Sequence, residues 1–168
     1  MIKTENMRLV AHHLQQQAMA ADVEHRDAFA RSAYNRYYYS VFLQSRDMMR
    51  QLDSSWSTIA HATYPQLLNG KIKTAFKAER KRALKNDDRE LIKSIDQACR
   101  SIAELRKIII KANQTRVVAD YKPEEGVVFS SAERFSLRSI DVTEAHGWSS
   151  QAGTLCQTIL KSWKQFNA

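Results

Sequence analysis

Residues that break helices are scarce in this chain. Its 168 residues include only 4 Gly and 2 Pro. A β-sandwich or β-barrel of this length needs a turn about every 8 to 12 residues, and such turns are built mostly from Gly, Pro, Asn and Asp. The composition therefore predicts an all-α protein made of long helices. The length corresponds to one domain, and we expect residues 1–168 to form it.

The sequence contains no pattern typical of a metal centre or a membrane segment. Cys99 and Cys156 stand alone, without Cys or His at the spacing of a structural zinc site. The first ten residues lack the apolar run of a signal peptide, and no stretch approaches the roughly 18 consecutive apolar residues of a membrane-spanning helix. We expect a soluble, cytoplasmic protein that needs no metal and no cofactor and does not contact a membrane.

The net charge of +8 is concentrated in one segment. Residues 71–85, KIKTAFKAERKRALK, contain one acid and the basic residues Lys71, Lys73, Lys77, Arg80, Lys81, Arg82 and Lys85. On a helix, four of these lysines follow one another at i, i+4, and like charges at that spacing repel one another. Two interpretations stay open: a solvated helix face, or a surface that is neutralised by a phosphate backbone.

Apolar periodicity predicts a bundle of four or five helices with up-down topology. The first helix is expected over residues 4–20, and the second begins at a cap on Asp22 or Asp27 and ends near residues 53–55. A long helix follows the basic one, from about residue 86 to residues 113–114. Residues 126–140 predict a small β-hairpin, and Asp141 or Thr143 caps the last helix.

The middle of the second helix, Arg31 to Phe42, reads RSAYNRYYYSVF. Asn35 and Arg36 interrupt its tyrosines inside a segment that otherwise forms core, and an Asn or Arg that is buried there must find polar partners. The Gly-rich, nucleophile-elbow and zinc-protease motifs of the common enzyme classes are missing from the sequence.

Three features follow one another along the chain: residues 31–42, His61 ahead of the basic helix, and Arg116-Val-Val-Ala-Asp-Tyr121 after a long helix. Together they resemble the HEPN domain. The similarity is to the small prokaryotic branch with an S-x-A-Y-Y-A-x-F-like helix and an R-x-x-A-D-Y turn. The resemblance implies a helical bundle, usually a homodimer, with Arg116 in a groove along the two-fold interface. Members of the family cleave RNA, act in toxin–antitoxin and antiviral defence systems, or bind nucleotides and nucleic acids.

The chain departs from the ribonuclease members of this family, in which a His follows the Arg by four to six residues. Here Tyr121 is the fifth residue after Arg116, and the next histidine is His146. The candidate catalytic residues are therefore Arg116, Tyr121, Asp120 and His61, with His61 or His146 as the imidazole. The alternative is structural: Arg116 pairs with Asp120 at a helix end, and Tyr121 fills the bundle.

Three hypotheses for the function follow. The first is a binding protein of a defence or toxin–antitoxin system, which engages RNA, another nucleic acid or a nucleotide through the basic helix together with Arg31, Asn35 and Arg36. The second is a metal-independent endoribonuclease toxin with a non-standard active site. The third is a non-catalytic subunit that docks on a larger, co-encoded protein partner.

Overall fold

The computed structural model describes residues 4–131 and 134–167, and it is mostly helical with a small antiparallel sheet before the last helix. This confirms the predicted all-α bundle with a β insertion. The chain divides into two compact units. Unit 1 consists of residues 1–43 and 110–150, and unit 2 consists of residues 44–109 and 151–168. Three helices, α2, α5 and α6, contribute residues to both units.

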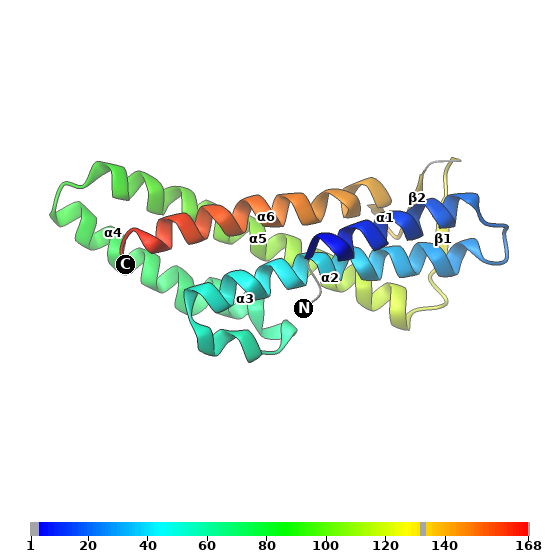
Figure 1. Ribbon diagram of the computed structural model, residues 1–168, viewed down its shortest axis with the longest axis horizontal. Coiled ribbons are helices and arrows are strands. Elements are labelled where there is room, and N and C mark those ends of the chain that lie inside the picture. Colours follow the sequence, from blue (N-terminus) through cyan, green and yellow to red (C-terminus); the bar gives the residue numbers. More distant parts are fainter. Residues whose placement is uncertain (1–3, 132–133, 168) are drawn as a thin grey trace. The chain divides into compact units, whose positions relative to one another are not determined.

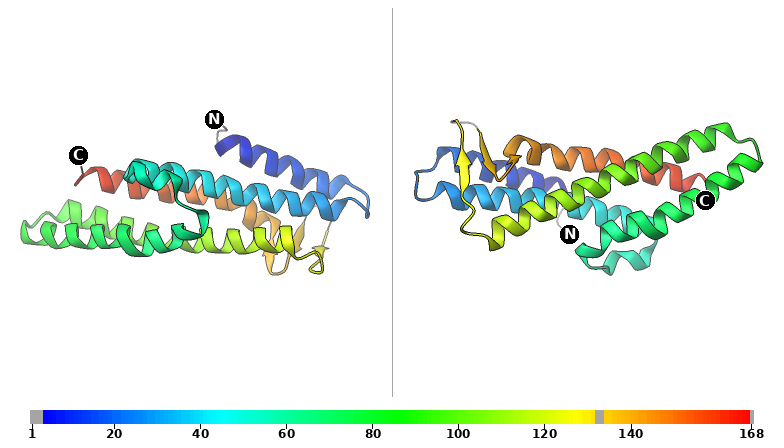
Figure 2. Two further views of the ribbon diagram at one scale, coloured as in Figure 1. Left: turned by 90° about the horizontal axis from the view of Figure 1, so that it is seen from below. Right: turned by 180° about the vertical axis from the view of Figure 1, so that it is seen from behind.

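Unit 1 contains a complete helix, parts of three others and the sheet. Its elements are α1 (Thr4–Ala20), the first part of α2 (Arg26–Leu52), the last part of α5 (Arg89–Tyr121), β1 (Val127–Phe129), β2 (Phe135–Leu137), β3 (Ile140–Asp141) and the start of α6 (Val142–Lys164). The core side of α2 follows helical spacing, because Ala30, Ala33, Tyr34, Tyr37 and Val41 are all fully buried. Figures 1 and 2 show α1 lying along this part of α2.

The sheet of unit 1 is held on α2 by a buried tyrosine. β1 pairs with β2 and β2 pairs with β3, both antiparallel, and Phe135 and Leu137 point into the core as predicted. The Tyr34 hydroxyl donates to the Ile140 carbonyl at 2.7 Å. An isolated hairpin is only marginally stable, so this anchoring, together with the third strand that the sequence did not predict, fixes the insertion.

Unit 2 is built around the basic helix. Its elements are the end of α2, η1 (Ser54–Thr58), η2 (His61–Thr63), α3 (Tyr64–Leu67), the π-helical turn η3 (Leu68–Ile72), α4 (Lys73–Lys85), the first part of α5 and the last part of α6. The inward side of α4 buries Phe76, whose ring packs against Trp163 and Phe166. This aromatic cluster attaches α4 to the end of α6.

The helix boundaries agree with the sequence except at the end of α5. The helix α1 spans Thr4–Ala20, and Asp22 and Asp141 cap the starts of α2 and α6 with their carboxylates. The prediction that the long helix ends at residues 113–114 was wrong. Thr115, Val118 and Ala119 continue its buried face, and the helix ends at Tyr121, just before Lys122-Pro123. The R-x-x-A-D-Y motif is therefore helical and not a turn.

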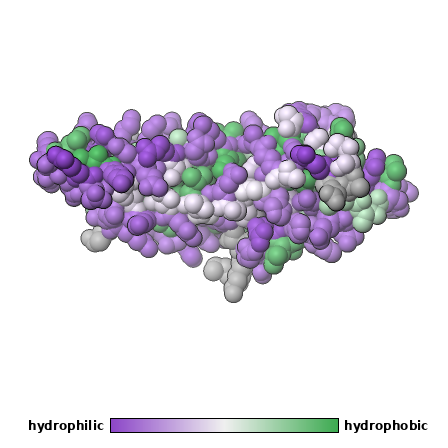
Figure 3. All heavy atoms as spheres, turned by 90° about the horizontal axis from the view of Figure 1, so that it is seen from above, coloured by the Kyte–Doolittle hydropathy of each residue, from purple (hydrophilic) through white to green (hydrophobic). Residues whose placement is uncertain are grey.

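Within the described residues, no helix is long and apolar enough to cross a membrane. The face drawn in Figure 3 is mostly hydrophilic, and its hydrophobic residues form small, separate patches.

Candidate nucleic-acid interface

A groove in unit 1 runs between the outer side of α2 and the last turn of α5. It is lined by Ala28, Arg31, Ser32, Asn35, Arg36, Ala119 and Asp120. The α2 residues of this set recur at intervals of three or four, which places them on one face of the helix. Four predicted site residues thus meet in one groove: Arg31, Asn35, Arg36 and Asp120.

Asp120 lies at the centre of the polar contacts in the groove. Its carboxylate accepts two hydrogen bonds from the Asn35 amide, at 2.8 and 3.0 Å. It also forms an ion pair with Arg116 Nε at 2.8 Å. Asn35 therefore has the polar partner that its position in the sequence required. The Arg116–Asp120 ion pair, the structural alternative for these two residues, is present.

Arg116 lies close to two aromatic rings. Its guanidinium carbon is 5.9 Å from the centroid of Tyr38 and 5.5 Å from that of Tyr121, distances typical of cation–π contacts. Tyr38 is buried, whereas Tyr121 is 65% exposed. The alternative in which Tyr121 fills the bundle was therefore wrong, because this ring has a face open to solvent. Nucleobases commonly stack on exposed aromatic rings and on arginine guanidinium groups, and here the two lie side by side.

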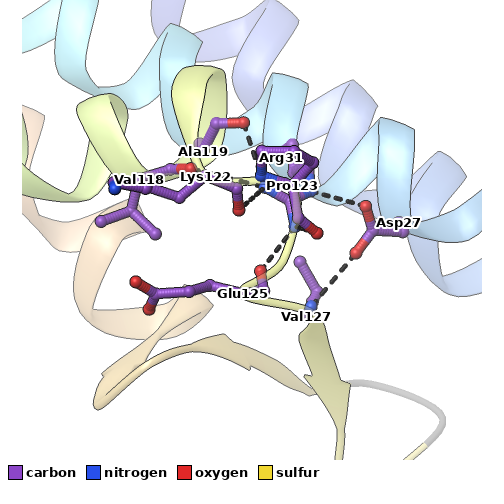
Figure 4. A network of polar contacts seen from close by, with 8 residues as sticks. All are labelled: Asp27, Arg31, Val118, Ala119, Lys122, Pro123, Glu125 and Val127. Atoms are coloured by element: carbon purple, nitrogen blue, oxygen red, sulfur yellow. Dashed lines mark hydrogen bonds and ion pairs between the residues drawn. The ribbon is translucent and has the colours of Figure 1, made fainter.

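Arg31 lines the groove, but its hydrogen-bond donors already bind acceptors of the protein itself (Figure 4). Nε donates to Asp27 at 2.6 Å. The two terminal nitrogens donate to backbone carbonyls at and beyond the end of α5, namely those of Val118, Ala119, Lys122, Pro123 and Glu125. The other oxygen of Asp27 accepts from the Val127 backbone N–H at 3.1 Å. Arg31 therefore caps α5, and a phosphate would have to compete with these acceptors.

Arg36 differs from Arg31 in being exposed. It needs no buried polar partner, because the buried residues of α2 lie on the other side of the helix. Its guanidinium lies 6.0 Å from the centroid of Tyr39, and it forms no ion pair with any described residue. Arg36 is therefore the cation of this groove with donors open to a ligand.

The cations predicted for the basic helix lie in unit 2, on η3 and α4. Two of them are already paired: Arg80 donates to Asp96 at 2.6 and 3.2 Å, and Arg82 donates to Glu79 at 3.1 Å. The hydrogen bonds from Arg80 hold the pKa of Asp96 below its usual value. Lys73 donates to Asn69 at 3.4 Å.

The other lysines of α4 remain open to solvent. Lys77, Lys81 and Lys85 are exposed and form no ion pair with another described residue. They recur every four residues, so a rise of about 1.5 Å per residue places neighbouring lysines roughly 6 Å apart along the helix. Lys71, in the turn η3 that directly precedes α4, is also exposed. The outer side of α4 therefore presents a row of positive charges, and the buried Phe76 holds the opposite side of the helix in the core.

The charge of the whole chain belongs to unit 2. Unit 2 holds 16 of the 26 Lys and Arg residues and 8 of the 18 Asp and Glu residues, a difference of +8. Unit 1 holds 10 of each and is neutral. Residues 71–85 alone contribute +6 of this. Electrostatic attraction of a polyanion is thus a property of unit 2 and, within it, mainly of α4 and the turn before it.

Neither candidate histidine is among the residues that line the groove. His61 is exposed in η2 of unit 2, whereas the groove belongs to unit 1. His146 lies in unit 1 but contacts the other side of α2: its Nδ1 is 3.0 Å from Tyr37 Oη, and its ring centroid is 5.0 Å from that of His12. Neither histidine lines the groove that contains Asp120.

The His146 contacts fix its protonation pattern. The Tyr37 hydroxyl donates its single proton to Gln15 Oε1 at 2.6 Å, so it accepts a hydrogen bond from Nδ1–H of His146. Burial, then the charges of His12 and Arg8, lower the pKa of His146 and favour its neutral form. This cluster could not be predicted from the sequence, because its members come from three helices and form no local pattern.

Metal and thiol chemistry receive no support from the geometry. The described residues contain no group of three or more His, Cys, Asp or Glu side chains able to hold a metal ion. Both cysteines are free. Burial raises the pKa of Cys156 to about 12, and burial followed by the charge of Asp96 raises that of Cys99. Neither thiol has the lowered pKa of a nucleophile.

These observations define a mostly helical protein with a cationic unit and a neutral unit, the second of which carries a polar groove beside an exposed tyrosine. Comparison of the chain with family models, curated proteins and solved structures gave no match.

Proposed function

We propose that the protein binds the phosphate backbone of nucleic acid through α4 of unit 2. The observation that carries this proposal is the row formed by Lys77, Lys81 and Lys85, exposed and without ion pairs among the described residues. Repulsion along such a row is relieved when phosphates neutralise it, and release of counterions from the nucleic acid drives the association. The spacing of about 6 Å along the helix is close to that of successive phosphates.

The experiment compares two triple variants with the same net charge. One replaces Lys77, Lys81 and Lys85 with Gln, which removes the row and keeps a good helix former at each position. The matched control replaces three exposed lysines elsewhere in unit 2, namely Lys93, Lys107 and Lys161. Binding of a fluorescent RNA and a duplex DNA is measured by anisotropy from about 50 to 200 mM salt.

The proposal expects the α4 variant to lose at least tenfold in affinity at the lowest salt. Each phosphate contact contributes about 0.7 to 0.9 to the slope of log K against log salt, so the slope should fall by about 2 to 3. The control variant should stay within about threefold of the wild type. Equal losses of affinity in the two variants would show that only the total charge matters and would contradict the proposal that α4 is the binding surface.

We further propose that the groove of unit 1 takes a nucleotide of a single-stranded nucleic acid, with Arg36 on a phosphate and Tyr121 stacked on a base. The open donors of Arg36 and the 65% exposure of Tyr121 support this arrangement. Replacing Tyr121 with Ala should weaken binding of single strands by about 1 to 3 kcal/mol and of duplexes much less. An equal effect on both would contradict stacking.

The endoribonuclease hypothesis has a direct test. RNA incubated with the protein in EDTA should remain intact, because the groove contains no histidine to transfer a proton. Cleavage that disappears in Arg116→Ala would replace the binding proposal with an enzyme whose site is built on Arg116 and Asp120.

Membership of the HEPN family, a role in a defence or toxin–antitoxin system, and a homodimer are proposals that rest on the sequence resemblance. Asn35 contacts Asp120 and Tyr38 contacts Arg116, so two of the three features that carry this resemblance meet in unit 1. A particle mass twice that of the 19.4 kDa chain in light scattering would support the dimer, and a mass of one chain would refute it.

A further inference from the structure

A second pocket of unit 1 lies between α5 and the β insertion, and it shares no lining residue with the groove described above. It encloses about 210 Å³ and is lined by Lys111, Gln114, Thr115, Val118, Leu137, Arg138, Ser139 and Ile140. We propose that this pocket binds a small organic anion with an apolar body.

The floor of the pocket is apolar. Val118 and Leu137 are buried, and the Ile140 side chain completes the surface next to them. Thr115 is also buried, and its hydroxyl is satisfied within α5 because it donates to the Lys111 carbonyl at 2.9 Å. The floor therefore favours the body of an apolar ligand, as is usual for small-molecule sites.

The rim carries two cations, each with a carboxylate partner. Lys111 pairs with Glu144 at 2.6 Å, and Arg138 pairs with Glu125. All four side chains are at least a quarter exposed, and exposed ion pairs contribute little to stability. A ligand anion can therefore replace either carboxylate at small cost. The Gln114 amide and the Ser139 hydroxyl, which form no side-chain hydrogen bond with another described residue, supply further donors.

The wall that faces α5 is held rigidly. Leu137 and Ile140 are opposite each other in the β2–β3 pair, so Arg138 and Ser139 form a two-residue turn. Arg138 has a φ of 52°, a left-handed conformation that normally selects Gly. The Tyr34 hydrogen bond to Ile140 fixes the strand that leaves the turn. A strained, non-glycine residue held by its surroundings is typical of ligand sites, and here it carries the rim guanidinium.

The size and charge of the pocket restrict the ligand. A volume of about 210 Å³ is below the range of roughly 300 to 1,000 Å³ that holds drug-sized molecules, so one ring or a short chain fits. Two rim cations and a neutral unit suit a single carboxylate or phosphate group and not a polyanion. The site is thus independent of the nucleic-acid surface on α4.

Titrations followed by ¹⁵N–¹H NMR of the full chain test the proposal with defined probes. Benzoate and phenyl phosphate carry the two kinds of anion on the same ring, benzyl alcohol lacks the charge, and inorganic phosphate lacks the ring. A probe of about ten heavy atoms should bind with a dissociation constant on the order of 1 mM or below. We expect shifts at Gln114, Ser139 and Ile140 with one or both ring anions, and at least tenfold weaker binding of benzyl alcohol and phosphate.

Two variants and a control connect binding to the rim. Arg138→Gly removes the guanidinium and adopts the turn without strain, so its thermal midpoint should equal or exceed that of the wild type. This variant and Lys111→Gln should each bind the anions at least fivefold more weakly, whereas Lys122→Gln, outside the pocket, should bind as the wild type does. The proposal is wrong if no probe shifts these residues, if benzyl alcohol binds as tightly as benzoate, or if the rim variants bind unchanged.

Discussion

Replacing Arg31 with Ala should destabilise unit 1 more than any other single change on the solvent side of α2. The Arg31 side chain is only 14% exposed, and its guanidinium joins Asp27 to the end of α5 (Figure 4). Four of its six hydrogen bonds are at least partly buried, those to Asp27, Val118, Ala119 and Glu125. The remaining two involve exposed carbonyls, which water can satisfy after the change.

The size of the effect follows from these contacts. A net value of about 1 kcal/mol for each partly buried hydrogen bond, reduced for the long one to Val118, gives a loss of about 3 kcal/mol. For a chain of 168 residues this corresponds to a fall in the midpoint of roughly 6 to 12 °C. Trp148, buried in unit 1, reports the transition by its fluorescence once Trp56 and Trp163 have been replaced with Phe.

Arg36→Ala provides the matched control. Arg36 lies on the same helix and loses the same side chain, but it is exposed and forms no ion pair with any described residue, so its change should cost under about 0.5 kcal/mol. Nucleic-acid affinity should show the reverse ranking: Arg36→Ala should weaken binding more than Arg31→Ala does. If the two variants unfold within about 0.5 kcal/mol of each other, Arg31 does not act as the cap of α5.

Three further predictions test other parts of the fold. The pKa of His146 is lowered in the fold, so unfolding is coupled to proton uptake below a pH of about 6.5, the unperturbed pKa. Thermal stability should therefore fall from pH 7 to pH 5, and it should fall less in His146→Gln. Tyr34→Phe removes the part-buried hydrogen bond to the sheet and should cost about 1 to 2 kcal/mol in urea unfolding, with loss of amide protection in β3 as its local signature. Burial and a raised pKa should keep Cys156 unalkylated by iodoacetamide at pH 8 until urea is added, whereas the partly exposed Cys99 should react first, as mass spectrometry would show; rapid native alkylation of Cys156 would contradict its burial.

Local features of the sequence were sufficient to predict most of the helices. Few breakers, helical spacing of apolar residues and capping aspartates gave α1, the end of α2 and the start of α6. The end of α5 was predicted too early because the polar pair Asn113-Gln114 resembles a helix stop. The stronger signal was Pro123, and the buried positions of Thr115 and Ala119 continue the helical spacing up to it.

Contacts between distant segments could not be predicted. The carbonyls that Arg31 binds lie 87 to 94 residues further along the chain, and backbone acceptors leave no trace in residue type. The sequence could therefore not distinguish Arg31, which binds these carbonyls, from the arginines whose donors are open to a phosphate. The contact between Asn35 and Asp120, 85 residues apart, was not predicted: the sequence indicated only that a polar residue inside an apolar helix needs a partner, and not which residue supplies it.

The division of charge between the units separates their roles in binding. In unit 1 the acids and bases are equal in number, and cations such as Arg116 and Arg138 already have carboxylate partners, so most anions that bind there must displace one. In unit 2 the bases outnumber the acids two to one, so at least half of its cations have no acid of that unit to pair with. A long polyanion therefore gains most from unit 2, where it neutralises repulsion without breaking ion pairs. Unit 1, by the same reasoning, favours ligands that combine a single charge or an open donor with an aromatic or apolar surface, which is what Tyr121 and the floor of the second pocket provide.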